Sequence, residues 1–166
     1  MRLMEYDRFA AVMYAHIWAY GRNPRYYDYE RIGGDCTNFA SQCLYAGSGI
    51  MNYTPEYGWY YIDANLKAPA WTGVPYLHQF LTRSNASVGP IGRECGIEEV
   101  QPGDIVQLRF SGDAFQHSPV VVRANRPRTP EDILVAAHSY DADNHPLSTY
   151  EYEAVRYIHI DGVLYP

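Results

Sequence analysis

The segment Gly33-Gly-Asp-Cys-Thr-Asn-Phe-Ala-Ser-Gln-Cys-Leu-Tyr-Ala46 decides the fold that we predict for this chain. Its two glycines favour a turn. The aspartate that follows is a good helix N-cap, because its carboxylate can accept hydrogen bonds from exposed amides. Apolar residues recur at helical spacing from Cys36 to Ala46, and the glycines that follow end the pattern. The sequence therefore predicts a buried helix with a cysteine in its first turn.

Cys36 is the candidate nucleophile of this helix. A cysteine reacts as its thiolate, and the free amides and dipole of a helix N-terminus favour that charge. The backbone N–H of Cys36 is also a natural oxyanion donor. Asp35 acts in the opposite direction, since a neighbouring negative charge raises the thiol pKa, so a nearby base is required. Taken alone, Cys36 equally fits a small buried core residue, which is what we expect of Cys43.

The first half of the chain is predicted to be helical. Apolar residues at helical spacing over 6–20, among them Phe9, Met13 and Ile17, predict a helix with that face buried. A shorter helix is predicted over 74–81. The intervening stretches 22–32 and 50–72, and the stretch 83–98, are expected to be loops or irregular.

The second half is predicted to be an antiparallel sheet. Short apolar runs between Pro, Asn and Asp residues predict strands, with a weaker one at the end; they cover 104–109, 119–124, 133–137 and 153–163. Helices followed by such strands indicate an α+β fold. We expect a single domain over 1–166, with a helical half at 1–82 and a sheet half at 99–163.

Two histidines flank the central strands. His117 precedes one strand and His138 follows the next, and a hairpin centred between Pro127 and Arg128 would set the two histidines directly opposite each other. His117 could then take the thiol proton while His138 orients its imidazole. Pro119 has no amide to donate, which predicts that His117 lies at a sheet edge or a bulge.

Composition excludes several classes of protein. The chain has 13 Lys and Arg against 19 Asp and Glu, a net charge of -6, and no basic stripe, so nucleic acid is not an expected partner. Three cysteines cannot all pair, which favours free thiols. We find no apolar signal core and no window long enough for a membrane span. A cytoplasmic protein without a cofactor is the default expectation, with export by another route left open.

Four segments together resemble the bacterial putative amidase domain family, a relative of the NlpC/P60 and CHAP cysteine hydrolases. The resemblance covers about residues 5–160 and rests on Asp35-Cys-Thr-Asn-Phe-Ala-Ser-Gln42, Gln101-Pro-Gly-Asp-Ile-Val106, His117 with its valine strand, and Val135-Ala-Ala-His-Ser-Tyr-Asp141. It implies a papain-like fold in which Cys36, His117 and His138 form a Cys-His-polar triad. It also implies hydrolysis of an amide bond; the substrate does not follow from the resemblance, and peptides of the cell-wall type are one class that we consider.

The remaining site residues are weaker candidates. For the oxyanion hole or substrate contacts we consider Asp35, Tyr29, Trp59 and Trp71. An alternative function is an inactive module whose aromatic 50–72 segment binds a peptide or glycan. A zinc site built from the cysteine and the two histidines is a third hypothesis, but the paired short spacings typical of zinc ligands are absent, so no metal is predicted.

Overall fold

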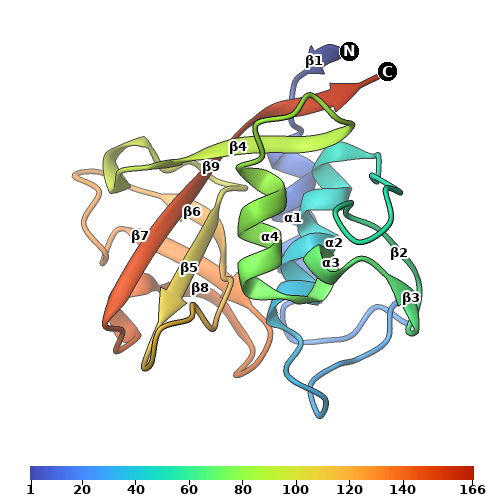
Figure 1. Cartoon of the computed structure of the whole chain (residues 1–166). Helices are drawn as coiled ribbons and strands as arrows, with labels where there is room; N and C mark the ends of the chain where they lie inside the picture. The colour runs from blue at the N-terminus through green and yellow to red at the C-terminus, as the bar shows by residue number, and fades with distance from the viewer.

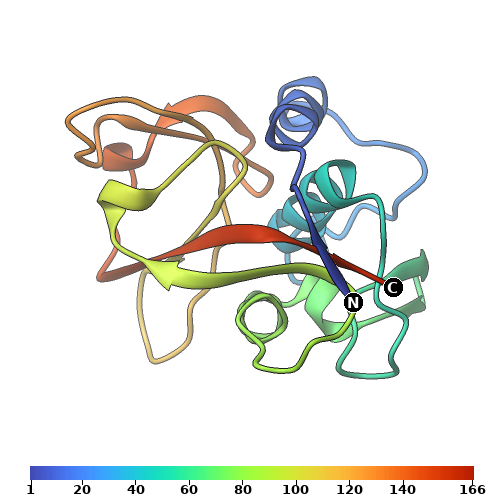
Figure 2. The same cartoon turned by 90° about the horizontal axis from the view of Figure 1, so that it is seen from above.

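The computed structural model describes all residues, 1–166. Helices gather on one side of the molecule and a strongly curved sheet lies on the other (Figures 1 and 2). The structure confirms the α+β class in general. The helices are α1 (Arg8–Trp18), α2 (Cys36–Ser48), α3 (Pro69–Thr72) and α4 (Val74–Leu81). No helix combines the length and the apolar character needed to cross a membrane.

The main sheet is antiparallel throughout, in the order β1-β9-β5-β6-β7-β8, with β4 also paired to β9. Its strands are β1 (Arg2–Met4), β4 (Gly89–Cys95), β5 (Ile105–Arg109), β6 (Val120–Ala124), β7 (Ile133–Ala137), β8 (Ala142–Pro146) and β9 (Ala154–Tyr165). A small hairpin, β2 (Tyr61–Asp63) and β3 (Leu66–Lys67), and two 3₁₀ turns, Ile97–Glu99 and Leu147–Thr149, complete the fold.

The central strands have an apolar side chain on both faces, which divides the core in two. Alternate residues such as Ile105 and Val120 face the helices and join a large cluster with Phe39 of α2. Their neighbours, such as Val106 and Val121, join a smaller cluster on the far face. Short, almost continuously apolar runs are what strands buried on both faces require. The strands predicted over 104–109, 119–124 and 133–137 are confirmed.

The prediction for 83–98 was wrong, because β4 occupies 89–95 and pairs along β9. Its sequence, Gly-Pro-Ile-Gly-Arg-Glu-Cys, has little strand character of its own. Gly92 is needed there, since a Cβ would lie 2.1 Å from the carbonyl oxygen of His159. Pairing with the long strand β9 therefore overrides local propensity.

The helix predicted over 6–20 forms, as α1, but its buried face was assigned wrongly. Phe9 and Ile17 are exposed, at 76% and 64%, whereas Ala11, Ala15 and Ala19 are fully buried. Small side chains let α1 approach α2 closely, so close helix packing selects the alanine face over the bulkier one.

Asp104 fastens the N-terminus to the sheet. Its buried carboxylate accepts hydrogen bonds from Arg8 (2.8 Å), from the Gln101 amide (2.8 Å), and from His159 and the Ile160 amide (both 2.9 Å). A buried carboxylate is stable only when its oxygens are satisfied in this way. The residue therefore joins three chain segments that are far apart in sequence.

Replacing Asp104 by Asn should lower the free energy of unfolding by about 3 kcal/mol, because Arg8 loses its buried partner. Urea denaturation at neutral pH measures the change. The matched control is Asp161→Asn, since Asp161 is 39% exposed and lies 3.9 Å from the same histidine, His159. Its expected cost is under about 1 kcal/mol. Equal losses in the two variants would contradict the role given to Asp104.

Candidate active site

Cys36 is the first residue of α2 and is 8% exposed. Its Sγ lies 3.7 Å from the Thr37 hydroxyl and 4.0 Å from the carbonyl oxygen of Gln116, and it accepts hydrogen bonds from the amides of Thr37 and Ser118. The thiol therefore rests against the backbone on both sides of His117. The backbone N–H of Cys36 has no backbone acceptor, as an oxyanion donor requires.

The pKa of the Cys36 thiol is raised, which corrects the expectation that the helix N-terminus favours a thiolate. Burial is the main cause, and the charge of Asp35 acts in the same direction. The hydrogen bonds from Thr37 and Ser118 lower the pKa but do not compensate for burial. At neutral pH the sulfur carries its proton.

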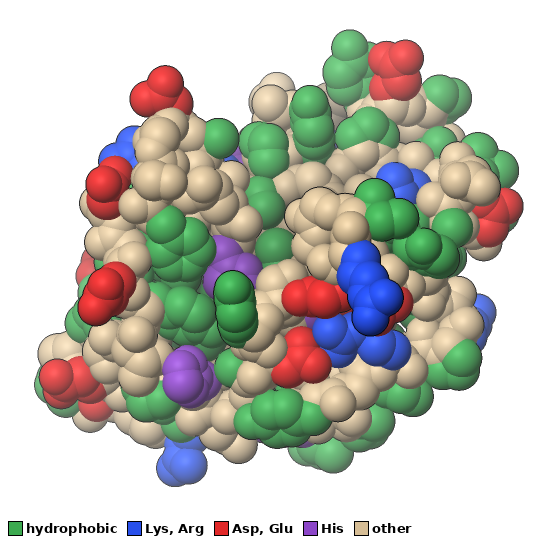
Figure 3. Space-filling model, turned by 90° about the horizontal axis from the view of Figure 1, so that it is seen from below, with side chains coloured by type: hydrophobic (Ala, Val, Ile, Leu, Met, Phe, Trp, Pro, Cys, Tyr) green, Lys and Arg blue, Asp and Glu red, His purple; other side chains and the backbone are tan.

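His117 forms an isolated bridge to Leu108, beyond the regular end of β5–β6 pairing. Its ring lies between those of Phe110 and Tyr150, at centroid distances of 6.2 and 5.7 Å. Burial lowers the pKa of His117 to about 4. The imidazole is therefore neutral at pH 7 and able to accept a proton. Figure 3 shows histidine side chains surfacing beside hydrophobic ones on this lower face of the molecule.

His138 does not hold His117. Its Nδ1–H donates to Oδ2 of Asp35 at 2.5 Å, and its Nε2–H donates to the carbonyl oxygen of Trp18 at 2.8 Å. Phe39 stacks on the ring at 4.0 Å. The predicted direct pairing of the two histidines is corrected by this geometry, since both ring nitrogens of His138 are already engaged.

Strand register explains the difference. Val120 pairs with Ala136, so continuing the ladder places Ser118, not His117, opposite His138. A one-residue shift sends a side chain to the other face of a sheet. His138 accordingly packs on Phe39 on the helical side. Of the two positions predicted for His117, the edge is excluded because β6 lies between β5 and β7, and the bulge is confirmed because the amides of both Gln116 and His117 donate to the Leu108 carbonyl, at 2.8 and 3.3 Å.

Asp35 and His138 form a buried ion pair, each side chain only 1% exposed. Asp35 and the Trp18 carbonyl occupy the two nitrogens of the His138 ring, so neither nitrogen is available to another partner. The Asp35 side chain also accepts from the Tyr29 amide and the Asn38 side chain, both at 2.9 Å. It occupies the N-cap position of α2 but makes no side-chain cap bond, which corrects that expectation.

A charged cluster covers this pair at the surface, where acidic and basic side chains gather in Figure 3. Arg22 lies 2.9 Å from Asp141, 3.2 Å from Asp28 and 3.7 Å from both Glu30 and Asp35. It links the loop before α2 to the turn between β7 and β8. The cluster thus fixes the loop that leads into Cys36.

Trp59 and Trp71, which we considered for substrate contacts, are fully buried in the core and do not line a cleft. Their indole N–H groups donate to Ser41 (3.0 Å) and Asn38 (2.9 Å) on α2. Tyr29 is 8% exposed and donates its hydroxyl hydrogen to the carbonyl of Ala64. None of these three groups is free to contact a substrate in this structure.

A buried polar relay beside the thiol was missed by sequence reasoning. The Thr37 hydroxyl donates to Ser118 Oγ at 3.2 Å. The Gln107 side chain donates to the same oxygen at 3.2 Å and to the carbonyl of Val74 at 2.9 Å. Gln107, a polar residue within the otherwise apolar part of β5, is the feature of the sequence that could have indicated these bonds. The structure does not support a zinc site built from Cys36, His117 and His138, because both ring nitrogens of His138 already have hydrogen-bond partners.

Comparisons with known proteins place the chain in a family. The family described as "Putative amidase domain" matches residues 5–160, and the chain belongs to that family. The chain is 34% identical over 143 residues to the uncharacterized protein YhbB of Bacillus subtilis strain 168. That match covers 85% of the chain but only 44% of YhbB. No solved structure matches the chain.

Replacing His138 by Ala should lower the free energy of unfolding by about 3 kcal/mol, because the buried Asp35 carboxylate loses its hydrogen-bonded partner. His145→Ala is the control, since His145 is half-buried and in edge-to-face contact with Tyr150 at 5.6 Å; about 1 kcal/mol or less is expected there. Chemical denaturation measures both. A small loss for His138→Ala would show that the pair does not hold the fold.

Alkylation of Cys36 by iodoacetamide should be slower at pH 7 than that of free cysteine and should accelerate only above about pH 9. The thiolate is the reactive form, and the raised pKa makes it scarce at neutral pH. Peptide mapping by mass spectrometry separates it from Cys95, whose pKa is raised to about 11. Fast labelling of Cys36 at pH 7 would contradict the neutral resting thiol.

Proposed function

We propose that this chain is a cysteine-dependent amide hydrolase, with Cys36 as nucleophile and His117 as general base. Membership of the amidase-domain family supports amide hydrolysis in general. The position of the Cys36 sulfur carries the finer proposal: it contacts the Gln116 carbonyl and the Ser118 amide, the two groups that flank His117.

In the proposed reaction, Sγ of Cys36 attacks the amide carbon as His117 takes the thiol proton. The oxyanion that forms is stabilised by the backbone N–H of Cys36. His117 then gives its proton to the leaving amine as the C–N bond breaks, which leaves a thioester. Water, deprotonated by His117, attacks the thioester; the acid product leaves and the thiol is restored.

Under this proposal Cys36 and His117 are both neutral before substrate binds, since the thiol is protonated and the imidazole is not. Proton transfer then accompanies the attack on the carbonyl. Amides of Thr37 and Ser118 support the transient negative charge on sulfur. This differs from a preformed thiolate–imidazolium pair.

Within this proposal the fold is papain-like: a buried helix bearing the nucleophile packs on an antiparallel sheet bearing the base. We treat residues 1–166 as one such domain. Asp35 and His138 act as positioning residues, because Asp35 is bonded directly to Cys36 in the chain. The substrate class is a peptide amide, cell-wall peptides included.

An inactive binding module is the second candidate. It is favoured by the raised thiol pKa and by the absence of a hydrogen bond from either Cys36 or His138 to His117. In that case Cys36→Ala would leave ligand affinity unchanged. Turnover distinguishes the two functions.

Hydrolysis of a panel of peptide anilides and muropeptides should be lost, by about 10³-fold or more, in Cys36→Ala and by about 10²-fold in His117→Ala. Since His117 is a base only when neutral, kcat/KM should fall as the pH drops through about 4. Cys43→Ala, which alters a buried thiol outside the site, is the control for nonspecific effects. Full activity in Cys36→Ala, or no turnover of any amide by the intact chain, would reject the proposal.

A further inference from the structure

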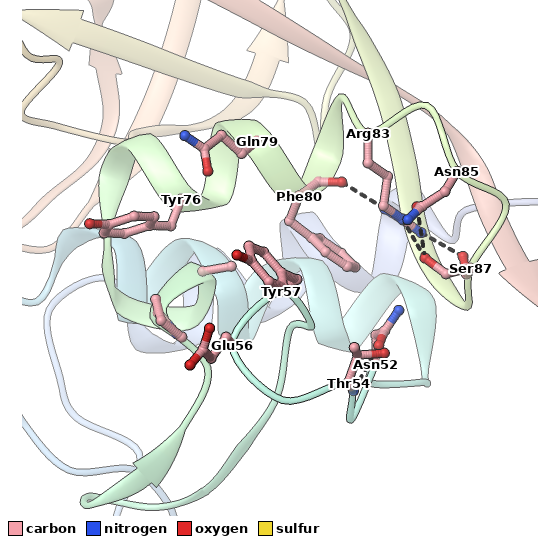
Figure 4. A pocket seen from close by; sticks show the side chains of 12 residues that line it. Asn52, Thr54, Glu56, Tyr57, Tyr76, Gln79, Phe80, Arg83, Asn85 and Ser87 are labelled. Atoms are coloured by element: carbon pink, nitrogen blue, oxygen red, sulfur yellow. Dashed lines mark hydrogen bonds between the residues drawn. The ribbon is translucent and has the colours of Figure 1, made fainter.

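A cavity lies away from Cys36, between α4 and the loops at 52–57 and 83–87 (Figure 4). Its volume is about 740 Å³, which is within the usual range for sites that take a small molecule. Tyr76 and Gln79 project from α4, and Glu56 and Tyr57 from the facing loop (Figure 4). Neither Cys36 nor His117 lines it.

The aromatic part of the lining is exposed and unused by the fold. Tyr57 is 82% exposed and Tyr76 is 52% exposed, and no hydrogen bond is drawn to either hydroxyl (Figure 4). Exposed aromatic rings offer a flat apolar face with a polar edge. Two such rings from separate segments suit a ligand with flat apolar faces and hydroxylated edges.

Two polar side chains of the lining are also free. The carboxylate of Glu56 and the amide of Gln79 make no hydrogen bond to other lining residues (Figure 4). A carboxylate accepts, an amide both donates and accepts, and tyrosine hydroxyls do both. A ligand with several neutral hydroxyl groups satisfies this combination.

Charge argues against an anionic ligand. Arg83 lies on the cavity wall, but all its donors are used by the protein: Nε bonds Ser87 Oγ, Nη1 the carbonyls of Phe80 and Pro90, and Nη2 those of Ser87 and Val88. No cationic donor remains for an incoming anion, and Glu56 would repel it.

The walls are held in place before any ligand arrives. Asn52 donates to the carbonyl of Val88 at 3.0 Å and accepts from the Thr54 amide at 3.0 Å, which joins the two loops. Glu56 has a φ of 64°, in the left-handed region that is unfavourable for a residue with a side chain. Such strain is typical of functional loops, and a preformed site lowers the ordering cost of binding.

We propose that this cavity is a saccharide-binding site that takes a neutral oligosaccharide, its sugar rings stacked on Tyr57 and Tyr76 and its hydroxyls bonded to Glu56 and Gln79. The site is independent of the chemistry proposed for Cys36. The cavity is nevertheless connected to the thiol through α4. The carbonyl of Val74, the first residue of α4, accepts a hydrogen bond from Gln107, which belongs to the polar relay beside Cys36.

Calorimetric titration of the full chain with cellotriose and with tri-N-acetylchitotriose tests the proposal. Saturable binding of at least one sugar is expected, and whichever binds more tightly tells whether hydroxyl or acetamido groups are preferred. Tyr57→Ala and Tyr76→Ala should each weaken binding about fivefold. Tyr53→Ala is the matched control, because Tyr53 is 62% exposed on the same loop but does not line the cavity.

Several results would overturn the assignment. These are no saturable binding of either sugar, equal weakening by Tyr53→Ala, or tighter binding of a cationic Lys-containing peptide that displaces the sugar. Cys36→Ala should leave sugar affinity unchanged; loss of binding there would place the sugar at the thiol instead. Thermal melting checks that each variant is folded, and Gln79→Ala, with an expected weakening of about threefold, tests the cavity without removing a ring.

Discussion

The buried ion pair between Asp35 and His138 joins the helical half of the molecule to its sheet at the position where Cys36 begins α2. Removing two charges from water is costly, and in this pair the cost is offset by further hydrogen bonds from Tyr29 and Asn38 to Asp35 and from His138 to the Trp18 carbonyl. Each bond comes from a different part of the chain. The ends of α1 and β7 and the start of α2 are therefore fixed relative to one another.

This arrangement explains why the thiol is not activated in the resting state. A helix N-terminus stabilises a negative charge by about 0.3–1 kcal/mol, whereas burial alone can shift a pKa by several units. Burial is the main cause of the raised pKa of Cys36, and the negative charge of Asp35 next to the sulfur acts in the same direction. His117 responds to the same burial in the opposite sense, since desolvation disfavours its cationic form.

The sequence predicted the elements with strong local patterns and failed where tertiary contacts decide. α2 and the central strands follow from apolar periodicity and turn residues, and Cys36 from its place at a helix start. The buried face of α1 was predicted wrongly, because large residues such as Phe9 outweigh alanines in any hydrophobicity pattern, while close packing favours the alanines. β4 forms through pairing with β9, which local propensity does not report. His138 contacts Asp35 and not His117 because the register between β6 and β7 differs by one residue from the one that we predicted. The spacing of residues in the sequence does not determine that register.

The relay through Gln107 makes the position of the thiol depend on α4 as well. Gln107 is fully buried, and its side chain donates to Val74 and Ser118 and accepts from Arg156 at 2.6 and 2.9 Å. A fully satisfied polar group in an apolar sheet fixes one arrangement, because any displacement leaves a buried donor or acceptor without a partner. Ser118 supplies the amide that contacts the Cys36 sulfur. The start of α4, the sheet and the nucleophile helix are thus fixed in their positions relative to one another. The Asp35–His138 pair and this relay constrain the position of the thiol from two sides.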